Sequence, residues 1–103
     1  MLEDFLVAKK FITLAHHVKG RMRLKVNPAI AKHPVRKKLE EISGTLPGVL
    51  DTRVNLLARS VVVRYDPEII SPAEFEALVL SKDENVSMEI IKKYESDQIL
   101  KEV

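Results

Sequence analysis

Three histidines are the side chains of this chain best suited to hold a metal ion: His16, His17 and His33. The 103 residues include no cysteine, so disulfides, iron–sulfur clusters and thiolate metal sites are excluded. Imidazole suits borderline ions such as nickel, cobalt, zinc or iron better than copper(I). His16 or His17 could also serve as an axial ligand of a haem. The sequence therefore leaves a transition metal and haem open as cofactors.

The spacing of the histidines limits how they could share one ion. His16 and His17 are adjacent, and neighbouring side chains of a regular strand point to opposite faces of the sheet. A bulge near Gly20, or a second copy of the chain, would be needed to bring enough ligands together. In the alternative without metal, the His16 side chain packs at the edge of the sheet, and His17 and His33 lie in solvent.

Basic side chains are the second group with a chemical role to consider, and they are concentrated in one half of the chain. Residues 11–64 carry a net charge of +8, whereas residues 65–103 carry −6. Between residues 21 and 26, basic and apolar side chains alternate, as in a strand with one exposed and one buried face. The predicted anion-binding or partner-binding face consists of Arg21, Arg23, Lys25, Arg53 and Arg64.

Several kinds of anion fit such a face, including phosphates, anionic lipid headgroups and acidic proteins. The outward positions hold no aromatic residue that would stack on bases, which argues against a nucleic-acid partner. The alternative is a charged surface that keeps the sheet solvated and prevents association with other sheets.

Apolar periodicity predicts the elements that position these residues. Alternation over residues 12–26 predicts one bent strand, or two strands in tandem around Gly20. An apolar stripe over residues 35–46 predicts an amphipathic helix that begins after Pro34. Strands are predicted at residues 49–56 and 60–65. Ser71, Pro72 and Glu74 then predict the capped start of a second helix, which runs to about residue 79.

Residues 86–103 allow two interpretations. Val86, Met88 and Ile90 alternate as in a strand, whereas Val86, Ile90 and Tyr94 share one face of a helix. We favour a short strand followed by a helical tail. The chain is then an α+β, ferredoxin-like βαββαβ sandwich with two helices on one face of a four-stranded antiparallel sheet. The predicted boundaries are an N-terminal extension at residues 1–11, the domain at 12–92 and a C-terminal helical tail at 93–103.

Three segments resemble heavy-metal-associated domains, which occur in metallochaperones and at the N-termini of metal-transporting P-type ATPases: residues 46–49 (LPGV), 54–56 (VNL) and 61–67 (VVVRYDP). Residues 20–24 (GRMRL) resemble the first strand of a divergent, cysteine-free branch that carries Gly-Arg-x-Arg-Leu. Metal-binding members of the family hold copper or zinc with a Cys-x-x-Cys in the loop after that strand. Here the loop spans residues 27–33 and has neither cysteine nor methionine, so that site cannot be transferred to this chain.

The resemblance implies a non-enzymatic binding or regulatory module linked to transition-metal homeostasis or transport. Its partner would be a metal-transporting P-type ATPase or a second copy of the chain. Two alternatives remain. The first is a basic adaptor that binds polyanions or an acidic protein through the open face of the sheet. The second is a protein that binds haem or a metal through histidine, as a monomer or in a dimer. No nucleophile elbow or phosphate-binding loop indicates an enzyme. No segment resembles a transmembrane span or a signal peptide, so a cytoplasmic location is expected.

Overall fold

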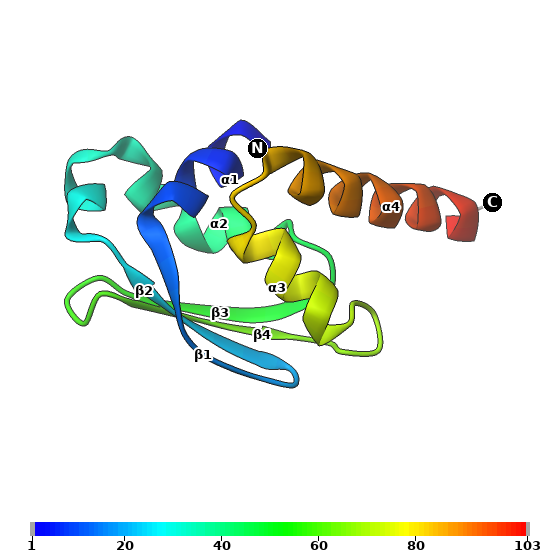
Figure 1. Ribbon diagram of the computed structural model, residues 1–103, viewed down its shortest axis with the longest axis horizontal. Helices are drawn as coiled ribbons and strands as arrows, with labels where there is room; N and C mark the ends of the chain where they lie inside the picture. The colour runs from blue at the N-terminus through cyan, green and yellow to red at the C-terminus, as the bar shows by residue number, and fades with distance from the viewer. Residues whose placement is uncertain (1, 103) are drawn as a thin grey trace.

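The computed structural model describes the backbone of residues 2–102 and the side chains of residues 2–95. The helices lie together on one side of a single sheet, and the other side of the sheet is open (Figure 1). This confirms the prediction of an α+β fold with a four-stranded antiparallel sheet. In chain order, the α-helices, strands and 3-10 helices (η) are α1 (Leu2–Ala8), η1 (Lys9–Phe11), β1 (Ile12–Val18), β2 (Arg21–Val26), η2 (Pro28–Lys32), η3 (Pro34–Lys38), α2 (Leu39–Gly44), β3 (Val49–Asn55), β4 (Ser60–Tyr65), α3 (Pro72–Leu80) and α4 (Glu84–Glu102).

The strand order across the sheet is β1-β2-β4-β3, and each neighbouring pair is antiparallel. Strands β2 and β3 therefore run parallel to each other with β4 between them, and residues 27–48 connect these two strands over the helical side. Strands β3 and β4 are joined by a short turn, which is the usual connection between antiparallel neighbours.

Residues 12–26 form a hairpin of two strands, which is one of the two arrangements that their alternation predicts. The chain reverses at Gly20, whose φ of +87° is rarely adopted by residues with a side chain. A Cβ atom at this position would also lie 3.4 Å from the backbone oxygen of Tyr65. The turn places β1 beside β2 at the edge of the sheet.

The prediction of a short strand around residues 86–90 is wrong, because this segment belongs to the helix α4. Three interactions favour the helix over the strand. The Asp83 carboxylate accepts a hydrogen bond from the Asn85 backbone at 2.9 Å, near the start of the helix. Ser87 is completely buried and donates to the Leu78 backbone oxygen of α3 at 2.8 Å. Ile90 packs on the core. The predicted βαββαβ order is therefore not the order observed, and β1 supplies the fourth strand.

The core lies between the sheet and the helices. Its largest fully buried apolar side chains are Tyr65, Phe75, Met22, Ile70 and Leu78. The rings of Tyr65 and Phe75 stack at a centroid distance of 4.2 Å, which joins β4 to α3. Helix α3 begins as predicted, with the Ser71 hydroxyl accepting from the Glu74 backbone at 3.1 Å.

The helix predicted over residues 35–46 is divided into the 3-10 helix η3 and the short helix α2. Its predicted apolar stripe is nevertheless entirely buried, at Val35, Leu39, Ile42 and Leu46. The period of the apolar residues therefore identifies the buried side of this segment, although the helix itself is shorter.

Neither predicted domain boundary coincides with a break in the structure. Helix α1 contributes the buried residues Phe5 and Ala8 to the core, so residues 1–11 are not a separate extension where they are described. Helix α4 runs without interruption across residues 92 and 93. Among the described residues, no helix has both the length and the apolar character required to cross a bilayer.

Candidate anion-binding face

The open side of the sheet carries three rows of side chains, and each row crosses all four strands. Residues directly opposite one another on neighbouring strands point to the same face, so the strand pairing defines the rows. We call their twelve residues the open face. In the order β1, β2, β4 and β3, the rows are Thr13-Lys25-Ser60-Asn55, His16-Arg23-Val62-Arg53 and Val18-Arg21-Arg64-Asp51.

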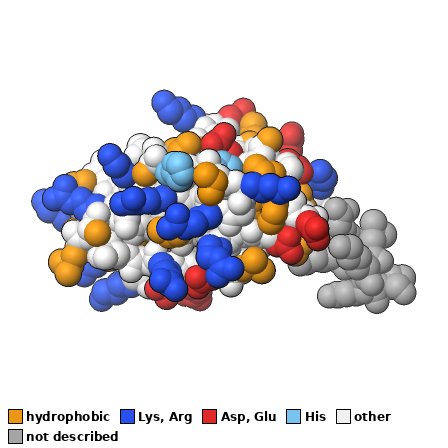
Figure 2. Space-filling model, turned by 90° about the horizontal axis from the view of Figure 1, so that it is seen from below, with side chains coloured by type: hydrophobic (Ala, Val, Ile, Leu, Met, Phe, Trp, Pro, Cys, Tyr) orange, Lys and Arg blue, Asp and Glu red, His pale blue; other side chains and the backbone are white. Residues whose placement is uncertain are grey.

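All five residues predicted for an anion-binding face lie in these rows, and all five are exposed: Arg21, Arg23, Lys25, Arg53 and Arg64. Neighbouring strands are about 4.8 Å apart and successive rows roughly 7 Å apart. These spacings are below the Debye length of about 8 Å at physiological salt, so the potentials of the cations add. Figure 2 shows Lys and Arg side chains spread across this side of the molecule.

One carboxylate, that of Asp51, is present among these twelve residues. Its Oδ2 atom lies 3.8 Å from Arg53 Nε and 4.0 Å from Arg64 Nη1. Such exposed ion pairs contribute little to the free energy of folding. Arg21 is directly opposite Arg64, and like charges in this position destabilise a sheet. Five cations against one carboxylate leave the open face strongly positive.

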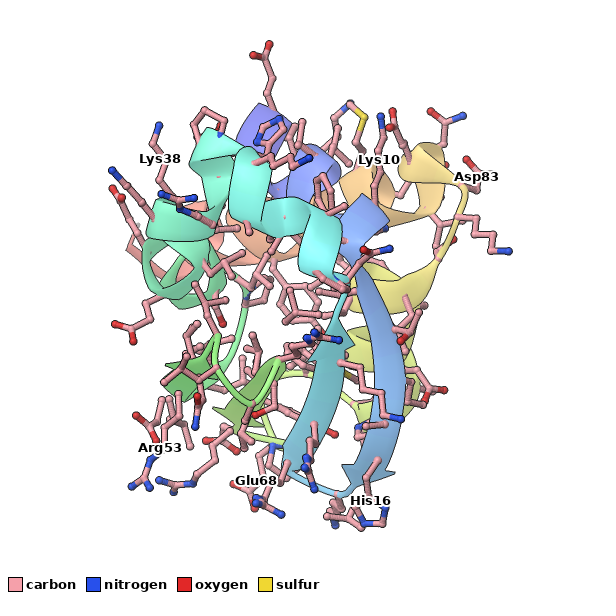
Figure 3. The ribbon with its side chains drawn as sticks, turned by 90° about the vertical axis from the view of Figure 1, so that its left-hand side faces the viewer. Lys10, His16, Lys38, Arg53, Glu68 and Asp83 are labelled. Atoms are coloured by element: carbon pink, nitrogen blue, oxygen red, sulfur yellow. The ribbon has the colours of Figure 1, made fainter. Side chains whose placement is uncertain are left out.

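His16 is exposed on the open face, directly opposite Arg23. The pairing of β1 with β2 skips one residue between Leu14 and His16, which is a β-bulge. The bulge lies earlier than Gly20, where the sequence predicts it, and it reverses the alternation of side chains in the rest of β1. Figure 3 shows His16 and Arg53 on the sheet side of the molecule, away from Lys10 and Lys38 on the helical side.

His17 lies on the helical side because of the same bulge, and its side chain is only 10% exposed. Its Nε2 atom is 2.7 Å from the Tyr65 hydroxyl, and its Nδ1 atom is 3.2 Å from Glu76 Oε1. The imidazole thus connects β1 with β4 and α3. The expectation of a solvated His17 is wrong. Tyr65 and Glu76 are distant in sequence, and no local pattern links them to this histidine.

His33 occupies a third environment, in the loop between η2 and η3. Its Nδ1 atom accepts a hydrogen bond from the Val35 backbone at 3.1 Å, so the side chain caps η3. Its ring is 5.7 Å from that of Phe11. The fold does not bring the three histidines together. In the described part of the chain, no group of three or more His, Cys, Asp or Glu residues is placed to hold a metal ion.

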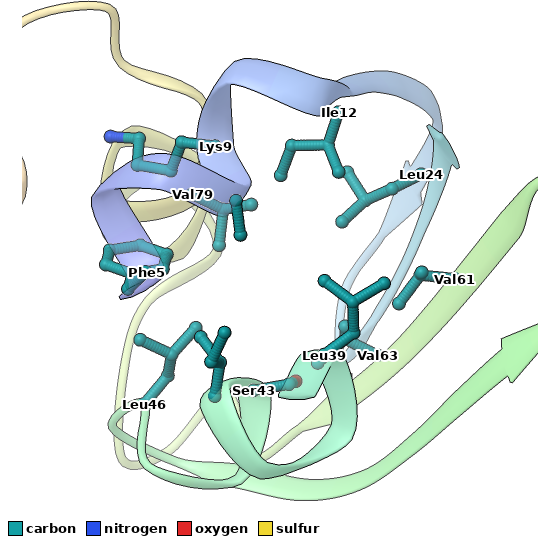
Figure 4. Close-up of a pocket in the computed structure, with 12 residues that line it drawn as sticks. Phe5, Lys9, Ile12, Leu24, Leu39, Ser43, Leu46, Val61, Val63 and Val79 are labelled. Carbon is teal, nitrogen blue, oxygen red and sulfur yellow. The ribbon is translucent and has the colours of Figure 1, made fainter. Parts of the chain in front are cut away.

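An apolar cavity of about 50 Å³ lies between α1, α2 and the sheet, and the sequence gives no sign of it (Figure 4). Phe5, Leu46 and Val61 are among its lining residues. Lys9 also borders it, but its amino group donates to Ser87 Oγ, away from the cavity. Burial lowers the pKa of Lys9, against the opposing effects of Glu84 and Asp83. The polar side chains at its border, Lys9 and Ser43, form hydrogen bonds with Ser87 and Thr52. The cavity therefore has, among its described lining residues, no free polar group to hold a polar ligand.

A scan of the chain against protein-family models finds no match, and neither a search of curated proteins nor a search of solved structures finds one.

Proposed function

We propose that this chain is a non-enzymatic binding module whose open face holds an acidic segment of a partner protein. One observation carries the proposal: five exposed cations stand in three rows across the sheet, with a single carboxylate among them. In the free protein, part of this arrangement is unfavourable, since Arg21 opposes Arg64. Carboxylates of a partner would remove that repulsion and pair with the cations.

The residue types on the open face favour carboxylates over bases. Four of the five cations are arginines, whose planar guanidinium groups bind carboxylates through two parallel hydrogen bonds. The face has no aromatic side chain on which a base could stack. Val18 and Val62 add apolar surface between the charges, and this suits a polypeptide whose acidic residues alternate with apolar ones.

The experiment is a titration of the protein with polyglutamate at several salt concentrations. The double variant Arg23→Glu, Arg53→Glu reverses two charges of the central row, and we expect its affinity to fall by at least about tenfold. The matched control, Lys10→Glu with Lys82→Glu, makes the same charge change at exposed residues outside the open face and should bind as the wild type does after correction for net charge. Binding should weaken as salt rises.

Two results would contradict the proposal. One is the absence of wild-type binding to polyglutamate at low salt. The other is an equal loss of affinity in the control variant, because the interaction would then depend on net charge and not on the rows. Tighter binding of single-stranded nucleic acid than of polyglutamate would replace the acidic protein by a different class of partner.

A link to transition-metal handling is supported by the resemblance to heavy-metal-associated domains, and a metal-transporting P-type ATPase or a second copy of the chain would then supply the partner. His16 is the histidine that lies exposed on the open face. Two copies of the chain would pool two such imidazoles. Equilibrium dialysis with nickel or zinc should then give half an ion per chain, lost in His16→Ala. Wild-type protein that retains no ion would refute this link at His16.

A further inference from the structure

The turn between β3 and β4 presents two leucines to solvent at one end of the molecule. Leu57 is 100% exposed and Leu56 is 42% exposed. An apolar side chain gains about 25 cal/mol for each Å² that it removes from water, so a fully exposed leucine is well placed to bury itself in a partner. The residues Leu56, Leu57, Ala58 and Arg59 are called the hairpin tip below.

The hairpin tip has a defined backbone that holds Leu57 outward. The Ala58 backbone donates to the Asn55 side chain at 3.0 Å, and the Arg59 backbone donates to the Leu56 oxygen at 3.2 Å. Arg59 has a φ of +53°, which completes the tight turn. Its backbone oxygen accepts from Val26 at 2.9 Å and joins the tip to β2. The exposure of Leu57 therefore results from an ordered turn.

Three basic residues border hollows that Leu56 of the hairpin tip also lines: Arg36, Lys37 and Arg59. A surface hollow of about 400 Å³ beside the hairpin tip is lined by Leu56, Arg36 and Arg59 together with residues of η2. Arg36 also donates to the Ala31 backbone oxygen, which fixes its guanidinium at the hollow. Residues 28–38 and 55–60 contribute five basic residues in all, at Lys32, Arg36, Lys37, Lys38 and Arg59, and they contain no acidic residue.

Nearby carboxylates reduce this positive charge only in part. Glu40 borders the neighbouring hollow that Arg36 and Lys37 line, and Asp4 lies 3.6 Å from Lys38. The left-hand end of the molecule in Figure 2 shows the result, where hydrophobic and basic side chains lie next to each other. An apolar projection within a basic surface matches a bilayer that carries anionic lipids, since its headgroups attract the cations and its acyl region accepts the leucines.

We propose that the hairpin tip docks on the surface of an anionic lipid bilayer. Leu57 and Leu56 enter the boundary between headgroups and acyl chains, and Arg36 and Arg59 bind a headgroup phosphate in the hollow beside them. This surface adjoins the first row of the open face at Asn55 and Ser60, but it uses none of that face's five cations. The two proposals can therefore hold or fail independently.

The first experiment is cosedimentation of the full chain with vesicles of phosphatidylcholine, with and without phosphatidylserine. We expect binding only to the vesicles with phosphatidylserine, and weaker binding as salt rises. Leu57→Ser should lower the partition coefficient by about tenfold. Arg36→Gln with Arg59→Gly should lower it by roughly 25-fold, at about fivefold for each lost cation. Glycine is chosen at residue 59 because it tolerates the positive φ.

The second experiment uses the absence of tryptophan from the chain. Leu57→Trp introduces a single fluorophore at the hairpin tip, and its emission should shift to the blue when vesicles with phosphatidylserine are added. Leu50→Trp is the matched control, since Leu50 is also exposed, at 60%, but lies near the other end of β3. Its emission should not shift.

Four outcomes would overturn the proposal. The wild type could ignore vesicles with phosphatidylserine at low salt. The two tryptophan variants could show the same shift. Leu57→Ser could bind vesicles as tightly as the wild type, which would mean that charge alone adsorbs the protein. The Arg23→Glu, Arg53→Glu variant could also lose as much vesicle binding as the Arg36→Gln, Arg59→Gly variant. That result would assign the lipid to the open face and not to the hairpin tip.

Discussion

The two sides of the sheet are built from the same strands but carry side chains of different character. On the helical side, Met22, Leu24 and Tyr65 are at most 3% exposed and make the apolar contacts of the core. On the open face, the residues that alternate with them are mostly charged, and Arg21 and Arg64 stand opposite each other with like charges. Folding explains the first side completely. It does not require five cations and one carboxylate on the second, and the acidic partner proposed above would account for them.

The comparison predicts, first, that truncation of a core side chain has a far larger effect on stability than truncation on the open face. Phe75 is completely buried and stacks on Tyr65, so Phe75→Ala should lower the free energy of unfolding by about 3–5 kcal/mol. Arg53→Ala, at a side chain that is 85% exposed, should change it by less than about 0.5 kcal/mol. Urea denaturation measures both, and comparable losses would contradict the distinction.

Second, the adjacent histidines should respond differently to the same substitution. His17→Ala leaves the buried hydroxyl of Tyr65 without its imidazole partner and should cost about 1–3 kcal/mol of unfolding free energy. His16→Ala removes an exposed side chain and should stay within about 0.5 kcal/mol of the wild type. If thermal unfolding ranks the two variants in the opposite order, the bulge does not place them on opposite sides.

Third, stability and binding should change in opposite directions at Arg21. Arg21→Thr removes one of two opposed cations and introduces a residue that favours strands, so the free energy of unfolding should rise by roughly 0.2–1 kcal/mol. The affinity for polyglutamate should fall in the same variant. A loss of both stability and affinity would show that Arg21 has a structural role that the pairing with Arg64 does not reveal.

Fourth, the helical layer should show a small loss of stability in acid. The hydrogen bond from Lys93 lowers the pKa of Glu74 below its usual 4.5, and a second bond from Tyr94 adds to this effect. A carboxyl with a lowered pKa stabilises the fold above its unfolded-state pKa, and this contribution is lost as pH falls through the folded-state value. Glu74→Gln should flatten that part of the pH profile, measured by denaturation between neutral pH and acid.

The sequence predicts the two sides of β2, β4 and residues 51–55 of β3 well, because their alternation is regular and the burial of one face leaves a single register. In β1 the same reasoning places His16 and His17 on the wrong sides. The bulge adds one residue near Ala15, and hydropathy does not indicate where, since the neighbouring residues fit either face.

The C-terminal segment could not be assigned from its sequence for a different reason. Val86, Met88 and Ile90 fit a strand, and Val86, Ile90 and Tyr94 fit a helix. The Asp83 cap at the start of α4 is a local signal for the helix, but the contact of Ser87 with α3 is a tertiary interaction and leaves no local pattern. The sequence does not predict the hairpin tip, because it assigns Leu56 to the strand at residues 49–56 and Leu57 to the turn after it, and only the structure shows that Leu57 is fully exposed.

The cavity beneath α1 gives this domain a particular response to hydrostatic pressure. Its volume of about 50 Å³ is lined mostly by apolar side chains, and water fills this volume when the surrounding contacts open. When the contacts around Phe5 and Leu46 open, the total volume of protein and solvent therefore falls, so pressure favours the opening. The contacts that α1 and α2 make around this cavity are for this reason where pressure should loosen the core first.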